Sequence, residues 1–257
     1  MPAHDLALLT DAARAAGQIA LRFWKNTPQI WDKADASPVT EADLAVNDML
    51  HQRLRSARQG YGWLSEETPD DTARLDCEHV FIIDPIDGTR AFIAGEKHFS
   101  HSLAVAKNGA ITAAVVYVPA LDRMYGATRD GPALMNDEQL TASTKALNEY
   151  PNILMSKATL NPDHWHGPAP VLQRSFRASI AYRLALVADG SFDAMLSFRP
   201  SWEWDIAAGS LIAARAGAKV CDCRGNPLQF NSPAAKSHGI FAGSTALFAD
   251  LFPRMNA

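Results

Sequence analysis

The chain has 257 residues, of which 47% are hydrophobic and 20% charged, with 15 glycines and 15 prolines. This composition is typical of a globular protein and excludes a disordered one. The net charge of -4, without a long Lys/Arg cluster, excludes the basic field that attracts a nucleic-acid polymer. An anionic small substrate stays compatible with this charge if bound metal ions supply local positive potential.

The sequence also predicts where the protein works. No apolar run reaches the roughly 18 residues that a membrane span needs, and Met1 to Trp24 lacks the basic flank of a secretion signal. The three cysteines form no disulfide framework, which suits a reducing compartment. Cys221 and Cys223 alternate along a predicted strand and are interpreted as packed thiols. We therefore expect a cytoplasmic protein without a membrane span.

Apolar spacing predicts the first elements in chain order. A helix is expected from Met1 to Trp24 and a second helix from about Thr40. Between them, Thr27 to Pro38 is predicted to form a loop or short hairpin that carries Lys33. Strands of a mixed or antiparallel sheet are expected at Gly62 to Leu64, Val80 to Ile83, Ser102 to Ala106 and Ile111 to Val118, with a hairpin turn at Lys107 to Ala110.

The later part of the chain alternates helices and strands. The pattern predicts a helix over Ile180 to Ala188, a strand over Phe192 to Leu196, a helix over Ile206 to Ala216 and a strand over Lys219 to Cys223. Turn residues dominate Thr128 to Asp163, so no element is assigned there. We expect one domain, 1-257, made of two intimate halves of approximately 1-135 and 136-257.

The segment from Phe81 to Thr89 carries the strongest chemical signal. An apolar strand ends in Asp84 and Asp87, which bracket Pro85 and precede Gly88. Proline interrupts a regular ladder and imposes a bend, so the two carboxylates can converge, and converging carboxylates repel unless a cation lies between them. The backbone after Gly88 could form a cradle for an anion. Asp-Pro and Asp-Gly are also common turn formers, and this alternative stays open at this point.

Further acidic residues stand where predicted elements end or begin. Glu66 and Glu67 follow the strand that starts at Gly62. Asp43 stands three residues after Thr40 in the pattern of a capping box. Asp205 precedes an Ala-rich helix, where it would serve as the N-cap or as a metal ligand beside two tryptophans.

Three strings together resemble the inositol monophosphatase family. They are, in chain order, Trp63-Leu64-Ser65-Glu66-Glu67, Asp84-Pro85-Ile86-Asp87-Gly88-Thr89 and Trp204-Asp205-Ile206-Ala207-Ala208-Gly209. The likeness extends to Pro38-Val39-Thr40-Glu41-Ala42-Asp43 and covers nearly the whole chain. It implies an α/β fold, a layered α-β-α-β-α sandwich, for a magnesium-dependent phosphatase of phosphomonoesters. Relatives are often homodimers and often inhibited by lithium.

The resemblance also assigns roles to residues. It implies that two or three Mg²⁺ ions are held by Glu66, Asp84, Asp87, Asp205 and the backbone carbonyl of Ile86. Glu66, Asp43 and Thr89 would be catalytic, with Thr89 and Asp43 taking the proton of the attacking water. Asp87, Gly88, Thr89 and Asp205 would bind the substrate. For Lys33, an approach to the metal site and a solvated position are equally supported.

The substrate is the least constrained prediction. We favour the CysQ-like 3'(2'),5'-bisphosphate nucleotidase branch, which converts adenosine 3',5'-bisphosphate to AMP and phosphate in sulfate assimilation. An inositol-1-monophosphatase or another small sugar-phosphate phosphatase is the alternative, and a non-catalytic phosphometabolite sensor is an alternative of another class.

Two groups of side chains bear on this choice. The arginines Arg174, Arg177 and Arg183 either bind a second phosphate or form a solvated face, and the latter is slightly favoured. The aromatic residues Trp202, Trp204 and Tyr182 either stack on adenine or pack together.

Overall fold

The computed structural model describes residues 2–26, 28–34 and 36–256. Met1 and Thr27, the predicted first residues of a helix and of a loop, lie outside these ranges. The helices are α1 (Pro2–Phe23), α2 (Glu41–Ala57), α3 (Thr89–Ile93), α4 (Ile180–Ala188), α5 (Glu203–Arg215) and α6 (Thr245–Leu251). The strands of the larger sheet are β3 (Gly62–Ser65), β4 (His79–Asp87), β5 (Ser100–Lys107), β6 (Ala110–Val118), β7 (Arg123–Thr128), β8 (Leu134–Met135) and β9 (Glu138–Gln139).

The remaining strands form three smaller groups. A five-stranded sheet contains β11 (Gln173–Ser175), β10 (Asn152–Leu154), β12 (Ala194–Ser197), β16 (Ile240–Gly243) and β14 (Lys219–Cys221), in that spatial order. The two pairs are β1 (Ile30–Asp32) with β2 (Pro38–Thr40), and β13 (Ser201–Trp202) with β15 (Lys236–Ser237). The first pair confirms the predicted short hairpin.

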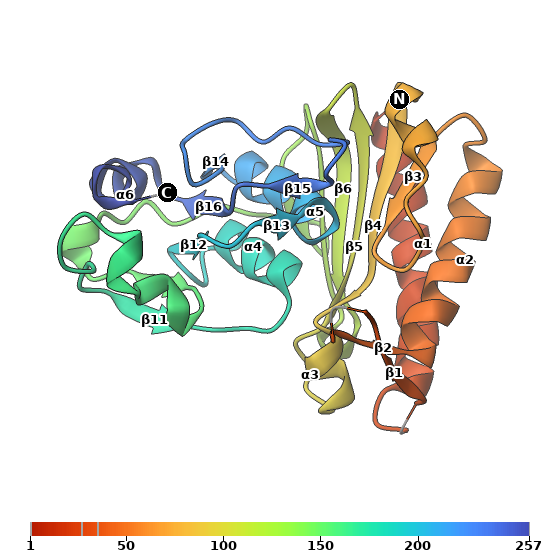
Figure 1. Cartoon of the computed structure of the whole chain (residues 1–257). Helices are drawn as coiled ribbons and strands as arrows, with labels where there is room; N and C mark the ends of the chain where they lie inside the picture. The colour runs from red at the N-terminus through yellow and green to blue at the C-terminus, as the bar shows by residue number, and fades with distance from the viewer. Residues whose placement is uncertain (1, 27, 35, 257) are drawn as a thin grey trace.

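The larger sheet is mixed, as predicted. Its seven strands lie in chain order from β3 to β9, and β3 is parallel to β4 whereas the other neighbours are antiparallel (Figure 1). Side chains of β4 alternate between its two faces. Phe81 and Ile83 pack in a buried cluster with α1 and α2, while Val80 and Ile82 pack in another cluster with α4 and α5.

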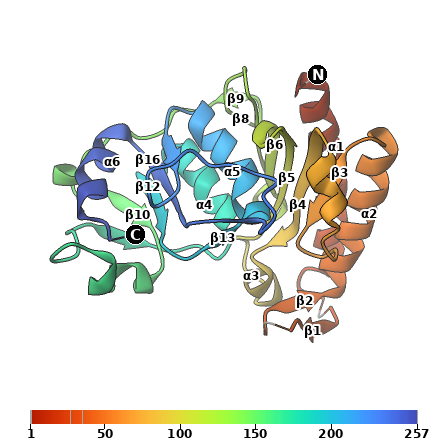
Figure 2. The same ribbon diagram turned by 45° about the horizontal axis from the view of Figure 1, so that its top comes forward.

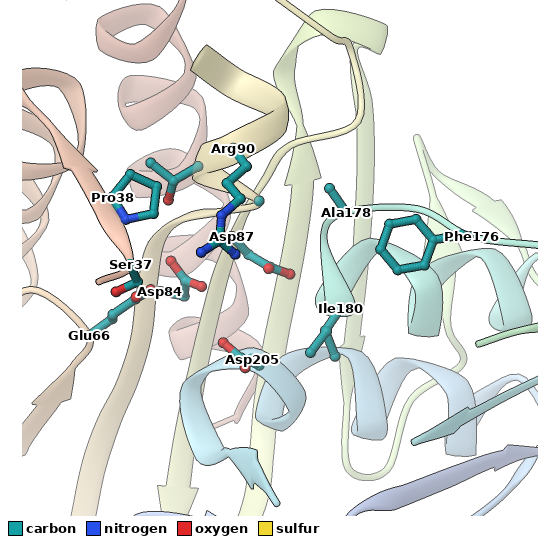
Figure 3. A pocket seen from close by; sticks show the side chains of 12 residues that line it. Ser37, Pro38, Glu66, Asp84, Asp87, Arg90, Phe176, Ala178, Ile180 and Asp205 are labelled. Atoms are coloured by element: carbon teal, nitrogen blue, oxygen red, sulfur yellow. The ribbon is translucent and has the colours of Figure 1, made fainter. Parts of the chain in front are cut away.

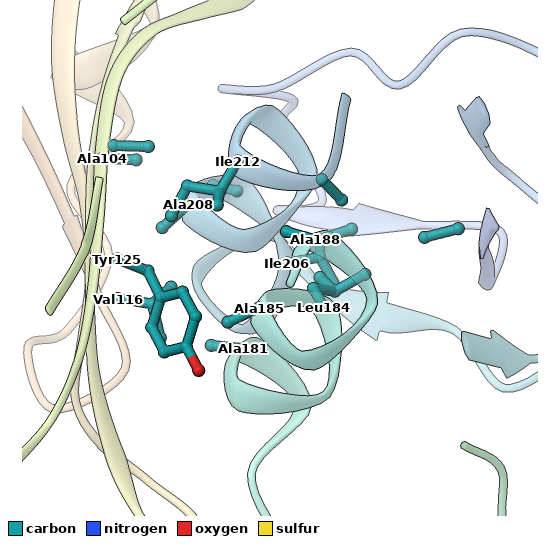
Figure 4. Packing of buried hydrophobic residues seen from close by; sticks show 14 of the residues in the cluster. Ala104, Val116, Tyr125, Ala181, Leu184, Ala185, Ala188, Ile206, Ala208 and Ile212 are labelled. Carbon is teal, nitrogen blue, oxygen red and sulfur yellow. The ribbon is translucent and has the colours of Figure 1, made fainter. Parts of the chain in front are cut away.

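The elements stack in five layers. The α1 and α2 helices cover one face of the larger sheet, α4 and α5 lie between the two sheets, and α6 lies beyond the five-stranded sheet (Figures 1 and 2). Figure 4 shows Val116 and Tyr125 of the larger sheet against Ala181 and Ala185 of α4. The predicted layered α-β-α-β-α sandwich is therefore confirmed.

A bulge interrupts the β4–β5 ladder at the acidic segment. Asp84 pairs with Ser102 and Asp87 with Ser100, so three steps along β4 match two steps along β5. The predicted irregularity at Pro85 is confirmed, but the strand continues through it to Asp87 and does not end before it. Proline has no N–H to donate to the neighbouring strand. The bulge leaves Pro85 outside the regular hydrogen-bond ladder, so the pairing resumes at Asp87.

The observed starts of α2 and α4 agree with the sequence predictions, whereas the start of α5 differs. The capping box of α2 is present, since Thr40 accepts from the Asp43 amide and Asp43 accepts from the Thr40 amide. The α4 helix has the predicted bounds, with Ser179 as its N-cap. Of the two alternatives for Asp205, the N-cap is wrong, because α5 begins at Glu203 directly after β13 and its N-cap is Trp202.

No helix within the described ranges is long and apolar enough to cross a membrane.

The close packing of α4 on α5 gives a stability test. A Cβ atom added to Gly209 of α5 would lie 2.5 Å from Leu184 Cβ of α4, closer than packed carbon atoms approach. We expect Gly209→Ala to lower the free energy of unfolding by about 1–3 kcal/mol, the usual effect of overpacking. Gly60→Ala is the control, because nothing lies within 4 Å of the added atom. Urea denaturation of the two variants measures the difference, and equal stabilities would contradict the packing.

Candidate active site

Four acidic side chains from three elements meet at one end of the larger sheet. Glu66 follows β3, Asp84 and Asp87 lie in β4, and Asp205 lies in the first turn of α5. Carboxylate oxygens of Glu66, Asp84 and Asp205 all lie within 4.8 Å of one another. Figure 3 shows these side chains directed into a common cavity together with Asp87. The structure thus brings together the four side chains that the sequence motifs singled out.

The surroundings of these carboxylates disfavour their charge. Asp84 is 1% exposed, and burial together with the charges of Glu66 and Asp87 raises its pKa well above the usual value. Burial and the carboxylates of Asp87 and Glu66 also raise the pKa of Asp205 well above its usual value. Such a group of acids retains its negative charge only if a cation compensates it.

Asp87 is held in place by the start of α4. Its Oδ2 accepts from Ser179 Oγ at 2.7 Å and from the Ala181 amide at 2.6 Å. Burial raises the pKa of Asp87 to about 6, although these hydrogen bonds act in the opposite direction. Residues of the C-terminal half of the chain, at the start of α4, therefore fix the orientation of the Asp87 carboxylate, which lies in the N-terminal half.

Thr89 and Asp43 form a second polar group beside the acids. Thr89 Oγ1 lies 3.3 Å from Asp43 Oδ1 and 3.2 Å from the carbonyl oxygen of Ile86. The other oxygen of Asp43, Oδ2, accepts from the amide and hydroxyl of Thr40 in the capping box. Burial raises the pKa of Asp43 to about 6. Asp43 thus has the predicted capping role, and its second carboxylate oxygen lies within hydrogen-bond distance of Thr89.

Lys33 approaches the acidic group. Its Nζ lies 2.8 Å from Glu66 Oε1 and 2.7 Å from Glu67 Oε1. Burial alone would lower the pKa of Lys33, but the two carboxylates raise it above its usual value. Of the two alternatives for this residue, the approach to the acidic site is the correct one.

The acidic side chains and the start of α3 line a cavity of about 310 Å³. Its walls are formed by Ser37, Pro38, Glu66, Asp84, Asp87, Gly88, Thr89, Arg90, Phe176, Ala178, Ile180 and Asp205. Sequence analysis did not assign a role to Arg90, Phe176, Ala178 or Ile180. The signal for Arg90 was its position directly after Thr89. In the loop at 176–178, sequence analysis considered only Arg177, and Phe176 and Ala178 carried no signal because only the fold brings them to this cavity.

The structure separates the three arginines that were considered together. Arg183 is 6% exposed, so the interpretation of a solvated face is wrong for it. It donates from Nε to the Arg177 carbonyl at 2.5 Å and from Nη2 to the Ala178 carbonyl at 3.3 Å. Arg174 is exposed and donates to the carbonyl of Met155. Arg177 is partly exposed and lines a cavity described below.

The aromatic residues considered for stacking on a base mainly contact protein. The rings of Trp202 and Trp204 stack on each other with centroids 4.5 Å apart, and Lys236 Nζ lies 3.7 Å from the Trp202 centroid. Tyr182 is 2% exposed. Packing is therefore the better supported of the two alternatives for these three residues.

A buried network fixes the beginning of α5. Glu203 Oε2 accepts from the Asn231 amide at 2.6 Å, and Oε1 accepts from the amide and hydroxyl of Ser232 at 2.9 and 2.6 Å. Arg74 donates to the Asn231 side chain and the Ser232 carbonyl, and it pairs with Asp70. Since β3 with its following Glu66 packs on the helix that contains Arg74 (Thr72–Asp76), this network links the Glu66 and Asp205 sides of the site.

The donor set fits a hard divalent cation. Asp84 Oδ1 is buried and has no hydrogen-bond partner among the residues that the structure describes. An oxygen in this situation is stabilised by a cation, and carboxylate oxygens are the ligands that magnesium prefers. Glu66, Asp84 and Asp205 can share one ion, and Asp87 lies beside them in the same cavity.

The comparison with known proteins agrees with this arrangement. The model of the inositol monophosphatase family matches residues 2–252. The chain belongs to this family. It is 34% identical over 236 residues to an inositol-1-monophosphatase of Mesorhizobium japonicum, with 86% of each chain covered. It is 30% identical over 223 residues to the 3'(2'),5'-bisphosphate nucleotidase CysQ of Escherichia coli, with 85% of this chain and 90% of the relative covered.

The fold of this inositol monophosphatase family member also matches solved structures. The suhB protein of Bartonella henselae superimposes with a TM-score of 0.83 at 28% identity, and 97% of each chain is covered. The family and its named relatives are metal-dependent phosphatases. The chain is therefore an enzyme that hydrolyses phosphoric monoesters.

The buried network at α5 predicts a stability effect. Glu203→Ala leaves two backbone N–H groups without their acceptor, so we expect the free energy of unfolding to fall by roughly 2–4 kcal/mol. Glu138→Ala, on the exposed strand β9, should change it by less than about 0.5 kcal/mol. Urea denaturation at pH 7 compares the two variants. A Glu203→Ala protein as stable as the parent would show that the network contributes nothing.

Proposed function

We propose that this phosphatase acts on 3'(2'),5'-bisphosphate nucleotides and converts adenosine 3',5'-bisphosphate to AMP and phosphate, as in sulfate assimilation. The observation that carries the proposal is a pair of opposite charges in one cavity. The carboxylates that line it suit a metal-bound phosphate, and the guanidinium of Arg90, which lines the same cavity, suits further negative charge on the same substrate. The 30% identity to the Escherichia coli nucleotidase supports this choice.

We propose that Glu66, Asp84, Asp87, Asp205 and the carbonyl of Ile86 hold two or three Mg²⁺ ions. When bound, magnesium supplies positive charge that polarises the phosphoryl group and lowers the pKa of an attacking water. Ser179 and the Ala181 amide orient Asp87 for this task, and Lys33 orients Glu66. Gly88 and Thr89 line the cavity beside Asp87 and are proposed to contact the phosphate, as are Asp87 and Asp205.

The chain's own proton acceptor is proposed to be the Thr89–Asp43 pair. Asp43 Oδ2 is occupied by Thr40, so only Oδ1 is oriented toward Thr89 Oγ1, 3.3 Å away. In hydrolysis, the water proton passes to Thr89 Oγ1 while the Thr89 proton passes to Asp43 Oδ1. The water oxygen bonds to phosphorus, the ester bond breaks, and the leaving alkoxide takes a proton from solvent.

Three further properties belong to the same proposal. We propose that residues 1-257 form one domain, since the largest buried cluster combines residues of the larger sheet with residues of α4, α5 and the smaller sheet. A cytoplasmic location is supported by three free cysteines. Lithium inhibition and a homodimer stay predictions from family resemblance.

An inositol-1-monophosphatase is the second candidate, favoured by the 34% identity to the Mesorhizobium japonicum protein. Phosphate release with Mg²⁺, from adenosine 3',5'-bisphosphate and from inositol 1-phosphate at matched concentrations, separates the two. We expect faster, lithium-sensitive release from the nucleotide. Faster release from inositol 1-phosphate would reject the nucleotide proposal. Binding of both compounds without release from either would support a non-catalytic sensor.

The metal assignment predicts the behaviour of Asp84→Asn. We expect phosphate release to fall by more than about 100-fold, because this side chain lies within reach of both Glu66 and Asp205. The rise in melting temperature that Mg²⁺ causes should disappear as well. Without metal, the variant should melt no earlier than the parent, since one repelling charge is gone.

Asp137→Asn is the matched control, because it makes the same chemical change on an exposed turn between β8 and β9. It should release phosphate at the parent rate. Unchanged release from Asp84→Asn would show that the metal assignment is wrong.

A further inference from the structure

A second cavity adjoins the acidic one. It has a volume of about 390 Å³ and is lined by Arg90, Ala91, Glu96, His98, Phe176, Arg177 and Ala178. Three of these residues, Arg90, Phe176 and Ala178, also line the acidic cavity. The two cavities therefore share a wall, and Figure 3 shows Ala178 and Phe176 on the side of the acidic cavity that lies away from Glu66. Each volume lies within the range of about 300–1,000 Å³ that is usual for sites of small ligands.

The charge of the second cavity is opposite to that of the first. Its ionised side chains are the guanidinium groups of Arg90 and Arg177 and the carboxylate of Glu96. The Arg90 guanidinium forms no hydrogen bond or ion pair with any residue that the structure describes. Arg177 uses Nη1 to donate to the Phe176 carbonyl at 2.7 Å, and its other N–H groups have no such partner within the described residues. The cavity thus offers several unused donors suited to an anion.

The positive charge in the second cavity also affects His98. Burial and the nearby Arg177 guanidinium lower the pKa of His98 below its usual value. The imidazole is therefore neutral at pH 7, and its ring stacks against Tyr182 with centroids 6.0 Å apart. A neutral imidazole retains one N–H donor, so His98 adds a donor without adding a charge.

A buried side chain holds the shared wall in position. Arg183 donates to the carbonyls of Arg177 and Ala178, and its guanidinium lies 4.4 Å from the centroid of the Phe176 ring. Arg183 is 6% exposed, so these contacts with the loop at 176–178 are made by a buried side chain. The loop that carries Phe176 and Arg177 is thus positioned by the fold, and Arg183 is a positioning residue for it.

We propose that Arg90 and Arg177 form a second anion subsite, which binds the phosphate group of the substrate that is not hydrolysed. Phe176, 49% exposed between the two cavities, contacts the organic part that joins the two phosphates. A substrate with one phosphate would leave the two guanidinium groups without a partner, whereas a second phosphate accepts paired hydrogen bonds from them. This subsite rests on the proposed function, since it explains a preference for bisphosphates.

The test uses two substrates that differ only in the second phosphate, adenosine 3',5'-bisphosphate and adenosine 3'-monophosphate. We expect the parent enzyme with Mg²⁺ to show a kcat/KM for the bisphosphate at least about tenfold higher. Arg177→Met and Arg90→Met should each reduce this ratio by about tenfold or more, mainly through KM for the bisphosphate. Arg177→Met is the more decisive, because Arg177 does not line the acidic cavity.

Arg174→Met is the matched control, since Arg174 lies three residues away, is exposed and lines neither cavity. It should retain the ratio of the parent. A ratio that stays unchanged in both Arg177→Met and Arg90→Met would overturn the subsite while leaving the nucleotide function intact.

A sugar pair separates failure of the subsite from failure of the nucleotide function. If neither nucleotide is hydrolysed, the same ratio is measured for fructose 1,6-bisphosphate and fructose 1-phosphate. If the enzyme prefers the sugar bisphosphate and Arg177→Met removes this preference, the subsite is supported and the proposed nucleotidase function is rejected. The absence of any such preference in both pairs would overturn the subsite.

Discussion

Mutual repulsion of buried carboxylates is the main electrostatic constraint on the site at the end of the larger sheet. Folding brings Glu66, Asp84, Asp87 and Asp205 into one cavity, where little water screens their charges. Some of these charges are compensated within the chain, by Lys33 at Glu66 and by the start of α4 at Asp87. Among the residues that the structure describes, no side chain of opposite charge forms an ion pair with Asp84 or Asp205. Such a set of anions calls for a compensating cation, which fits the metal dependence of the family.

The bulge in β4 explains how two carboxylates of one strand reach the same cavity. In a regular strand, residues three positions apart point to opposite faces. The extra residue between Asp84 and Asp87 shifts the alternation by one, so both side chains line one cavity. The carbonyl of Pro85 accepts from His101 Nδ1 at 2.5 Å. Burial lowers the pKa of His101 to about 4, so this histidine is neutral. Its hydrogen bond to the Pro85 carbonyl stabilises the bulge.

Local patterns predicted the parts of the site that local geometry controls. The capping box, the α4 bounds, the proline irregularity and the acidic motifs all depend on residues close in sequence. The helix start at Glu203 was missed because an aspartate is favoured both at the N-cap and within the first turn, where the helix dipole stabilises it.

Other features depend on distant partners, and the sequence carries no signal for them. Arg74 meets Asn231 across 157 residues, and the loop at 176–178 reaches α3 only through the fold. The strands β8 and β9 have two residues each, too few to show an alternation.

The order in which the site residues occur in the chain has a consequence during protein synthesis. The larger sheet and its helices α1 and α2 are complete once residue 139 has left the ribosome, so Glu66, Asp84 and Asp87 can come together early. The partners that orient Asp87, Ser179 and the Ala181 amide, follow later, and Asp205 follows them. The nascent chain therefore carries an incomplete acidic site for a period of its synthesis. The group of three carboxylates that could share one ion is complete only when α5 packs and brings Asp205 to Glu66 and Asp84.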